Sequence, residues 1–235
     1  MANFYANPYD TSASGFYFDD NDEMERKYAA SRAEEFEIDL MDGSPAEVSL
    51  WQMIGPLGMP DMETWFDRLE DLDEHEMAAL GFLVGDLNVP LETALETYDE
   101  PIMRTGSAED AVAEFVDDIG GPGNITNPEY YFDFASFGRD LRMDDHPFHG
   151  DSYEDMGLTD EEGDKLREQY ERMSDEELAE DRLDGMGGVK ELGKQTLENY
   201  FDYAKLARDM GYNSELAEFR FAGTNYVVMN AAGLG

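Results

Sequence analysis

The sequence contains no cysteine, which excludes disulfide bonds, thiolate metal sites and cysteine nucleophiles. It is also poor in basic residues: 16 Lys and Arg stand against 56 Asp and Glu, a formal net charge of −40. Direct binding to nucleic acid is not expected, because the phosphate backbone would repel the protein. Anionic membrane surfaces would repel it for the same reason.

Long hydrophobic stretches are missing as well. The longest run of small or apolar residues, 77–85, is about half the roughly 18 residues that a membrane-spanning helix needs. The first residues lack the basic segment followed by an apolar segment that is typical of a secretory signal. We therefore expect a soluble, cytoplasmic protein that does not interact with membranes.

No catalytic motif is present. His75 and Glu76 begin a pattern typical of zinc proteases, but Ala79 occupies the place of the second histidine. The glycine clusters near residues 120 and 187 lack the lysine and hydroxyl residue of a phosphate-binding loop. The sequence predicts no enzyme, no metal site and no cofactor.

The chain has enough apolar residues to fold, with 41% hydrophobic and 12% aromatic residues. We predict an α+β protein built as an elongated chain of small modules, because an extended arrangement relieves the repulsion between like charges. The expected modules are an N-terminal module with a small antiparallel sheet plus a helix (1–46), a helical module (47–105), a first acidic helical repeat unit (106–150), and a second repeat unit with a terminal β-hairpin (151–235).

Hydrophobic periodicity places the main elements. Short aromatic runs predict strands at 3–6 and 15–18, and alternation predicts another at 36–40. Acid in the first turn and bases later predict a helix from about 22 to 32. Helical spacing continues over 47–98.

One segment occurs twice. Residues 131–141, YFDFASFGRDL, return 69 residues later at 200–210 as YFDYAKLARDM, with six of eleven positions identical. Both aromatic segments are expected to be helical. A helix starting at Ser107 precedes the first copy, with capping boxes at Thr159…Glu162 and Ser174…Glu177 before the second. The expected buried residues of the first helix are Ala111, Val112, Phe115, Val116 and Ile119.

The acidic residues gather on predicted helices at 62–79, 107–119, 158–172 and 174–184. B-form DNA carries one negative charge per roughly 1.7 Å, so forty charges correspond to about 68 Å of duplex. One helix presents a carboxylate row only every ~6 Å, but several helices side by side could reach a higher density. The alternative is that these are merely solvated faces. The candidate partner-binding residues are Asp19, Asp20, Asp22, Glu23, Glu63, Asp67, Glu70, Asp71, Glu74, Glu109, Asp110, Glu114, Asp117, Asp118, Asp160, Glu161, Asp175 and Glu176.

The order of several motifs resembles the ArdA antirestriction proteins of phages and mobile elements. The motifs that carry this resemblance are Phe4-Tyr5-Ala6, Gly15-Phe16-Tyr17-Phe18, Glu34-Glu35-Phe36-Glu37-Ile38-Asp39, Ala94-Leu95-Glu96-Thr97-Tyr98, Ser107-Ala108-Glu109-Asp110 and the segment 131–141. Residues 1–143 with 217–230 are similar to one complete family member, and 144–210 is an addition. The resemblance implies a homodimeric DNA mimic without catalytic residues, which blocks type I restriction-modification enzymes.

Two other interpretations stay open. The protein could be an acidic mimic that inhibits another host defence or nucleic-acid-binding protein. It could also be a salt-adapted acidic protein, an interpretation that the excess of eleven Arg over five Lys favours.

Overall fold

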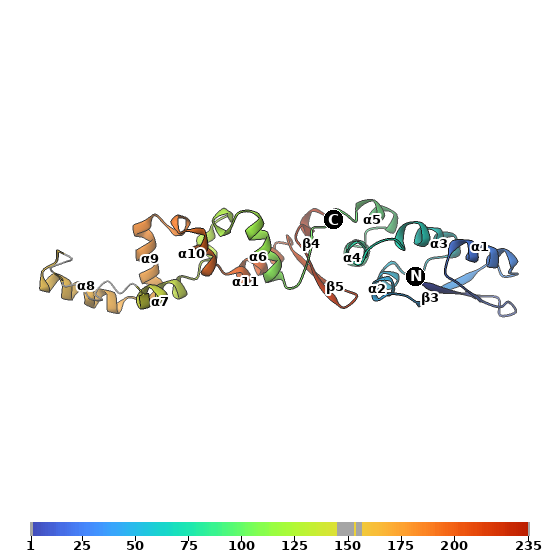
Figure 1. Cartoon of the computed structure of the whole chain (residues 1–235), viewed down its shortest axis with the longest axis horizontal. Helices are drawn as coiled ribbons and strands as arrows, with labels where there is room; N and C mark the ends of the chain where they lie inside the picture. Colours follow the sequence, from blue (N-terminus) through green and yellow to red (C-terminus); the bar gives the residue numbers. More distant parts are fainter. Residues whose placement is uncertain (1, 145–152, 154–156, 235) are drawn as a thin grey trace. The chain divides into compact units, whose positions relative to one another are not determined.

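The computed structural model describes residues 2–144, 153 and 157–234 (Figure 1). It confirms the α+β class, since helices accompany two small antiparallel sheets. The chain forms two compact units, Met1–Ala111 with Met210–Gly235, and Val112–Asp209. We call them unit 1 and unit 2. The module boundary expected near residue 150 lies outside the described residues.

The N-terminal sheet has the order β2-β1-β3 and is antiparallel throughout. Its strands are β1 (Asn3–Pro8), β2 (Phe16–Phe18) and β3 (Phe36–Asp42), which confirms the three strands predicted from the sequence. Burial alternates along β1, where Phe4 and Ala6 are buried and Tyr5 between them is not. One face of the sheet therefore belongs to the core.

The helices of unit 1 begin at residues whose side chains accept a backbone N–H bond. Asp20 caps the first helix, Ser44 the second and Asp73 the fourth, as short oxygen side chains do at N-caps. Two of the helices end in a π-helical turn. The helices are α1 (Asn21–Ala30), α2 (Pro45–Ile54), α3 (Met62–Thr64, continued by the π-helical Trp65–Leu69), α4 (Glu74–Gly81, continued by the π-helical Phe82–Asp86) and α5 (Leu91–Thr97).

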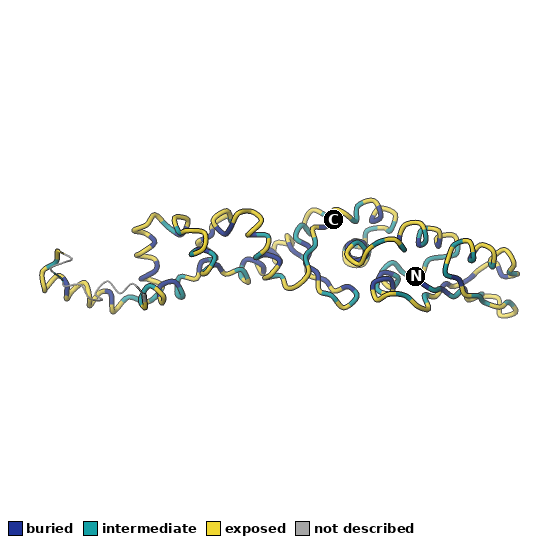
Figure 2. Tube along the Cα trace, viewed as in Figure 1, coloured by how far each residue is buried: buried dark blue, intermediate teal, exposed yellow. Residues whose placement is uncertain are grey.

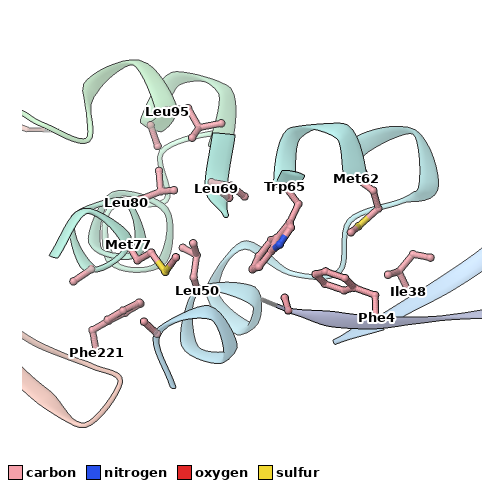
Figure 3. Packing of buried hydrophobic residues seen from close by; sticks show 14 of the residues in the cluster. Phe4, Ile38, Leu50, Met62, Trp65, Leu69, Met77, Leu80, Leu95 and Phe221 are labelled. Atoms are coloured by element: carbon pink, nitrogen blue, oxygen red, sulfur yellow. The ribbon is translucent and has the colours of Figure 1, made fainter. Parts of the chain in front are cut away.

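Aromatic side chains form the centre of the unit 1 core, close to the sheet (Figure 3). The Phe4 ring lies 5.4 Å from the ring of Trp65 and 5.3 Å from that of Trp51, and Phe4 and Trp65 are fully buried. The same cluster contains Phe221 near the C-terminus. Burial of this kind contributes about 1.5–3 kcal/mol per large apolar side chain.

The predicted terminal hairpin is present as β5 (Ala217–Phe221) and β6 (Thr224–Val228). The turn between the two strands is Ala222-Gly223, and both residues have a positive φ. It begins one residue before the turn that the sequence predicts at 223–225. A third strand, β4 (Met103–Thr105), pairs with β6 and was not predicted. The hairpin was grouped with the second repeat, but it packs into the core of unit 1.

Unit 2 is helical, and each repeat copy contains an acidic helix followed by the helix of its aromatic segment. Helix α6 (Ala108–Asp118) and helix α11 (Tyr203–Tyr212) extend across its boundary with unit 1. The two predicted capping boxes, at Thr159 and Ser174, are confirmed. The other helices are α7 (Phe134–Asp144), α8 (Asp160–Arg172), α9 (Asp175–Met186) and α10 (Lys194–Asn199).

Two expectations about the repeats are wrong. The aromatic segments are only partly helical: Phe132 and Phe201 form an antiparallel β-bridge, and the helices begin after them. The cause is Asp133, whose carboxylate accepts the N–H of Ser136 and so acts as a helix cap. Ile119 was expected to be buried but is 37% exposed, because α6 ends at Asp118 before the bend of the chain.

The two repeat copies contact each other reciprocally. The N–H of Asp133 donates to the carbonyl of Tyr200 at 2.8 Å, and the N–H of Asp202 donates to the carbonyl of Tyr131 at 2.7 Å. Residues 131 and 133 correspond to 200 and 202 in the repeat, so each bond is the counterpart of the other. This is the contact pattern of a two-fold symmetric dimer, here within one chain.

Helix α7 of the first copy packs closely against α9 of the second. A Cβ atom added at Gly138 would lie 1.7 Å from the carbonyl oxygen of Asp175, whereas one added at Gly185 meets nothing within 4 Å. Gly138 therefore allows the two helices to approach, and Gly185 has no such role.

We predict that Gly138→Ala lowers the free energy of unfolding of unit 2 by at least about 1–3 kcal/mol, the usual cost of overpacking. Gly185→Ala is the matched control and is expected to raise stability slightly, by up to about 1 kcal/mol, because alanine favours a helix. Urea unfolding of both variants, with hydrogen exchange to locate the change, measures the difference. Equal stability of the two variants would contradict the close approach.

Candidate functional site

Both units are strongly acidic by themselves. Unit 1 holds 29 Asp and Glu against 6 Lys and Arg, a formal net charge of −23, and unit 2 holds 27 against 10, a net charge of −17. Most residues of α8 and α9 are exposed, and buried positions interrupt them only at Gly163 and Tyr170 on α8 and at Leu178, Ala179 and Leu183 on α9 (Figure 2).

Four predicted site residues lie where β2 leads into α1. Asp19 follows the strand, and Asp20 caps the helix by accepting the N–H of Glu23 at 2.6 Å. Asp22 is exposed in the first turn. Glu23 pairs with Lys27 at 2.9 Å and with Arg26 at 3.6 Å, and the hydrogen bond from Lys27 lowers the pKa of Glu23. Glu23 is thus partly neutralised, unlike its neighbours.

A second acidic segment begins within α3 and continues past its π-helical turn to the start of α4. The predicted residues Glu63, Asp67, Asp71 and Glu74 are exposed there. Arg68, in the middle of this segment, donates to the carbonyl of Leu95 at 2.9 Å. This hydrogen bond directs the Arg68 guanidinium to α5. The surrounding carboxylates have no cation of their own on this helix.

Glu70 differs from the other carboxylates of this segment because it is half-buried. Burial raises the pKa of Glu70, and the negative charges of Glu47, Asp71 and Asp19 raise it further. The structure therefore brings Asp19 and Glu70, two predicted site residues far apart in the sequence, into one electrostatic environment.

Helix α6 carries five predicted site residues, and all of them are exposed: Glu109, Asp110, Glu114, Asp117 and Asp118. Asp110 accepts the hydroxyl of Ser107 at 2.6 Å at the start of the helix. Asp117 accepts a bond from Lys194 of the second repeat copy at 2.8 Å. This bond lowers the pKa of Asp117 and raises that of Lys194.

Helices α8 and α9 begin with acidic turns. Asp160, Glu161 and Glu176 are exposed, and Glu161 pairs with Lys165 at 2.7 Å. Asp175 is half-buried and pairs with Arg142 of α7 at 2.9 Å. Acidic first turns are favoured because the helix N-terminus carries partial positive charge.

Basic side chains of unit 2 connect the two repeat copies. Lys194 reaches Asp117, and Arg142 binds both Asp175 and the carbonyl of Met173. Lys205 donates to the carbonyl of Tyr130 at 2.5 Å and lies 3.6 Å from the centre of that ring. These cations are engaged in holding the copies together.

Most of the predicted site residues form no ion pair with any described residue. We call them the unpaired carboxylates. Of the remainder, Glu23, Asp117, Glu161 and Asp175 form ion pairs, while Glu114 and Asp118 have further contacts. The unpaired carboxylates are Asp19, Asp20, Asp22, Glu63, Asp67, Glu70, Asp71, Glu74, Glu109, Asp110, Asp160 and Glu176.

The N-terminal sheet holds two further exposed carboxylates that the candidate set omitted. Glu37 and Asp39 alternate with the buried Phe36 and Ile38 on β3, so they lie on the face turned away from the core. The alternation at 36–40 is the sequence signal that indicates their exposure.

Within the described ranges, no group of three or more His, Cys, Asp or Glu is arranged to hold a metal ion. Nor does any helix in this part of the chain have the length and apolar character needed to cross a membrane. Comparison with protein-family models, curated proteins and solved structures gives no match.

The environment of Glu70 generates a prediction about pH. Because its pKa is raised in the folded protein, the ionised form is disfavoured there, and stability is lost as the pH rises above the ordinary value of 4.5. Glu70→Gln should therefore raise the free energy of unfolding at pH 7, by less than about 1 kcal/mol. The gain should disappear below pH 4.5.

Urea unfolding at both pH values measures this effect, and Glu63→Gln, on the same segment but exposed, is the charge-matched control. A gain of equal size in the control would show that general repulsion, not the environment of Glu70, is responsible.

Proposed function

We propose that the protein is a DNA mimic with antirestriction activity, which occupies the DNA-binding groove of a type I restriction-modification enzyme. The observation that supports this best is the set of unpaired carboxylates on elements of both units, combined with cations that are held between the repeat copies. A basic groove meeting these surfaces would find negative charge that is not already neutralised. No catalytic residue is required for such an activity.

Each unit by itself carries as much net negative charge as a substantial length of duplex DNA. At one charge per roughly 1.7 Å of B-form DNA, the net charge of −23 in unit 1 corresponds to about 39 Å of duplex, and the −17 of unit 2 to about 29 Å. This net negative charge speeds association with a basic protein, and salt weakens the attraction.

The motif order that resembles the ArdA family supports the choice of a type I enzyme, and with it a homodimer in the host cytoplasm. The second repeat copy is the addition to that pattern. It brings two more acidic helices, α8 and α9, which favours a second candidate: inhibition of another host defence or nucleic-acid-binding protein with a longer or different basic groove.

A competition experiment tests the proposal. We expect the protein to displace DNA from a type I methyltransferase core at low salt. If it takes the place of 6–10 phosphates, its affinity should fall by on the order of 10³- to 10⁵-fold between about 50 and 200 mM salt. Failure to displace DNA at any salt concentration would reject this target.

Matched variants separate imitation of DNA from net charge alone. The double variant Glu109→Gln with Glu176→Gln removes two unpaired carboxylates, and Glu161→Gln with Glu168→Gln removes two carboxylates that already pair with Lys165 and Arg172. Both change the net charge equally. We expect only the first to weaken inhibition and to reduce the salt slope by about one per lost contact. Equal losses would indicate a response to net charge.

A fold that melts below molar salt, together with no affinity for basic proteins, would instead support salt adaptation.

A further inference from the structure

The face of the N-terminal sheet that points away from the core carries two tyrosines beside acidic and amide side chains. Tyr5 of β1 lies opposite Tyr17 of β2 on one side and opposite Asp39 of β3 on the other. Asn7 of β1 lies opposite Glu37. We call these five residues the outer sheet face.

The Tyr5 ring has a defined place on this face. Its centroid lies 4.7 Å from that of Tyr17. A Cβ atom at Gly15 would come within 2.4 Å of the Tyr5 hydroxyl oxygen. Glycine therefore leaves the space in which the ring lies across the neighbouring strand. Tyr17 is 53% exposed and Tyr5 is partly exposed, so the two rings, tilted by 51° to each other, form an aromatic platform that solvent reaches.

These tyrosines are not needed to fill the core. The opposite face of the sheet already buries Phe4, Ala6, Phe18 and Ile38. A cross-strand aromatic pair contributes only about 0.2–1 kcal/mol to stability. Removing one ring should therefore leave the unit folded.

The charged side chains on the strands of this face are of one sign, and Lys27 of α1, which donates to the carbonyl of Tyr17 at 2.7 Å, is already paired with Glu23. The three strands contain no Lys or Arg, while Glu37 and Asp39 are both exposed on β3. A ligand that matches the face must offer positive charge to the carboxylates and a flat group to the rings. Arginine combines both, because its planar guanidinium stacks on aromatic rings and binds carboxylates with two parallel bonds. Lysine offers only a compact charge.

We propose that the outer sheet face docks an arginine-bearing basic segment of the partner protein. One arginine side chain of the segment stacks on Tyr17, the more exposed ring, and further N–H groups of the segment donate to Asp39 or Glu37 on β3. This inference rests on the proposed function, which supplies a basic partner. It adds a preference for arginine over lysine, which attraction between opposite charges does not by itself explain.

The test uses oligoarginine and oligolysine peptides of equal length as probes, with binding to the full chain measured by calorimetry at physiological salt. We expect arginine peptides to bind about two- to fivefold more tightly per engaged side chain, the effect of an exposed cation–π contact. Tyr17→Ser should abolish the preference, and Asp39→Asn should weaken arginine binding. Tyr212→Ser and Asp99→Asn replace an exposed tyrosine and an exposed aspartate elsewhere and should change neither.

Equal affinity of the unaltered protein for both peptides would overturn the inference, as would an equal effect of the control variants. Perturbation of the Tyr5 and Tyr17 signals by neutral oligosaccharides, and not by arginine peptides, would also overturn it.

The DNA displacement experiment separates this inference from the proposed function. If the unaltered protein displaces DNA and Tyr17→Ser does so equally well, the docking role fails and the DNA mimic stands. If the unaltered protein displaces no DNA from the methyltransferase but loses its arginine preference in Tyr17→Ser, the docking role stands and that target fails.

Discussion

The shortage of cations is the constraint on which the rest of this structure depends. With 16 Lys and Arg for 56 Asp and Glu, most carboxylates cannot be paired and must stay hydrated or accept hydrogen bonds. Glu47 is the one charged residue that is buried among those described, and its carboxylate accepts the N–H of Ser44 in a capping box. Elsewhere acid collects in the first turns of helices, where the N–H groups and the helix dipole favour it. The constraint thus places the charge on the surface, while the described Phe and Trp side chains are buried or partly buried.

The repeat shows where the few cations are used. Two acidic copies packed against each other would repel unless something joins them, and Lys194, Arg142 and Lys205 lie at that junction. The backbone bridge at Phe132 and Phe201 adds two reciprocal hydrogen bonds that do not depend on charge. Cations at the junction are not available to neutralise the outward-facing carboxylates. The use of the few cations between the copies therefore both holds the copies together and leaves their surfaces negatively charged.

The sequence predicts the elements better than their partners. Alternation at 36–40 and the capping boxes at Thr159 and Ser174 are local signals, and the structure confirms them. The strand β4, only three residues long, depends on β6 more than a hundred residues away and has no local signature. The same holds for the candidate site: exposure of the acidic helix faces follows from periodicity, whereas the electrostatic effect of Asp19 on the pKa of Glu70 depends on the fold.

Net charge alone cannot select one basic partner among many. A net charge of −40 attracts any basic protein, and salt in the cell screens the attraction over about 8 Å. Discrimination needs contacts that depend on shape, and the outer sheet face is a place where such contacts and negative charge coincide, since the Tyr5 ring lies beside Tyr17 and opposite Asp39. If the acidic helices bring a basic partner close, an aromatic platform can then distinguish arginine from lysine. Attraction and selection would thus reside in different parts of the chain, and each can be altered without the other.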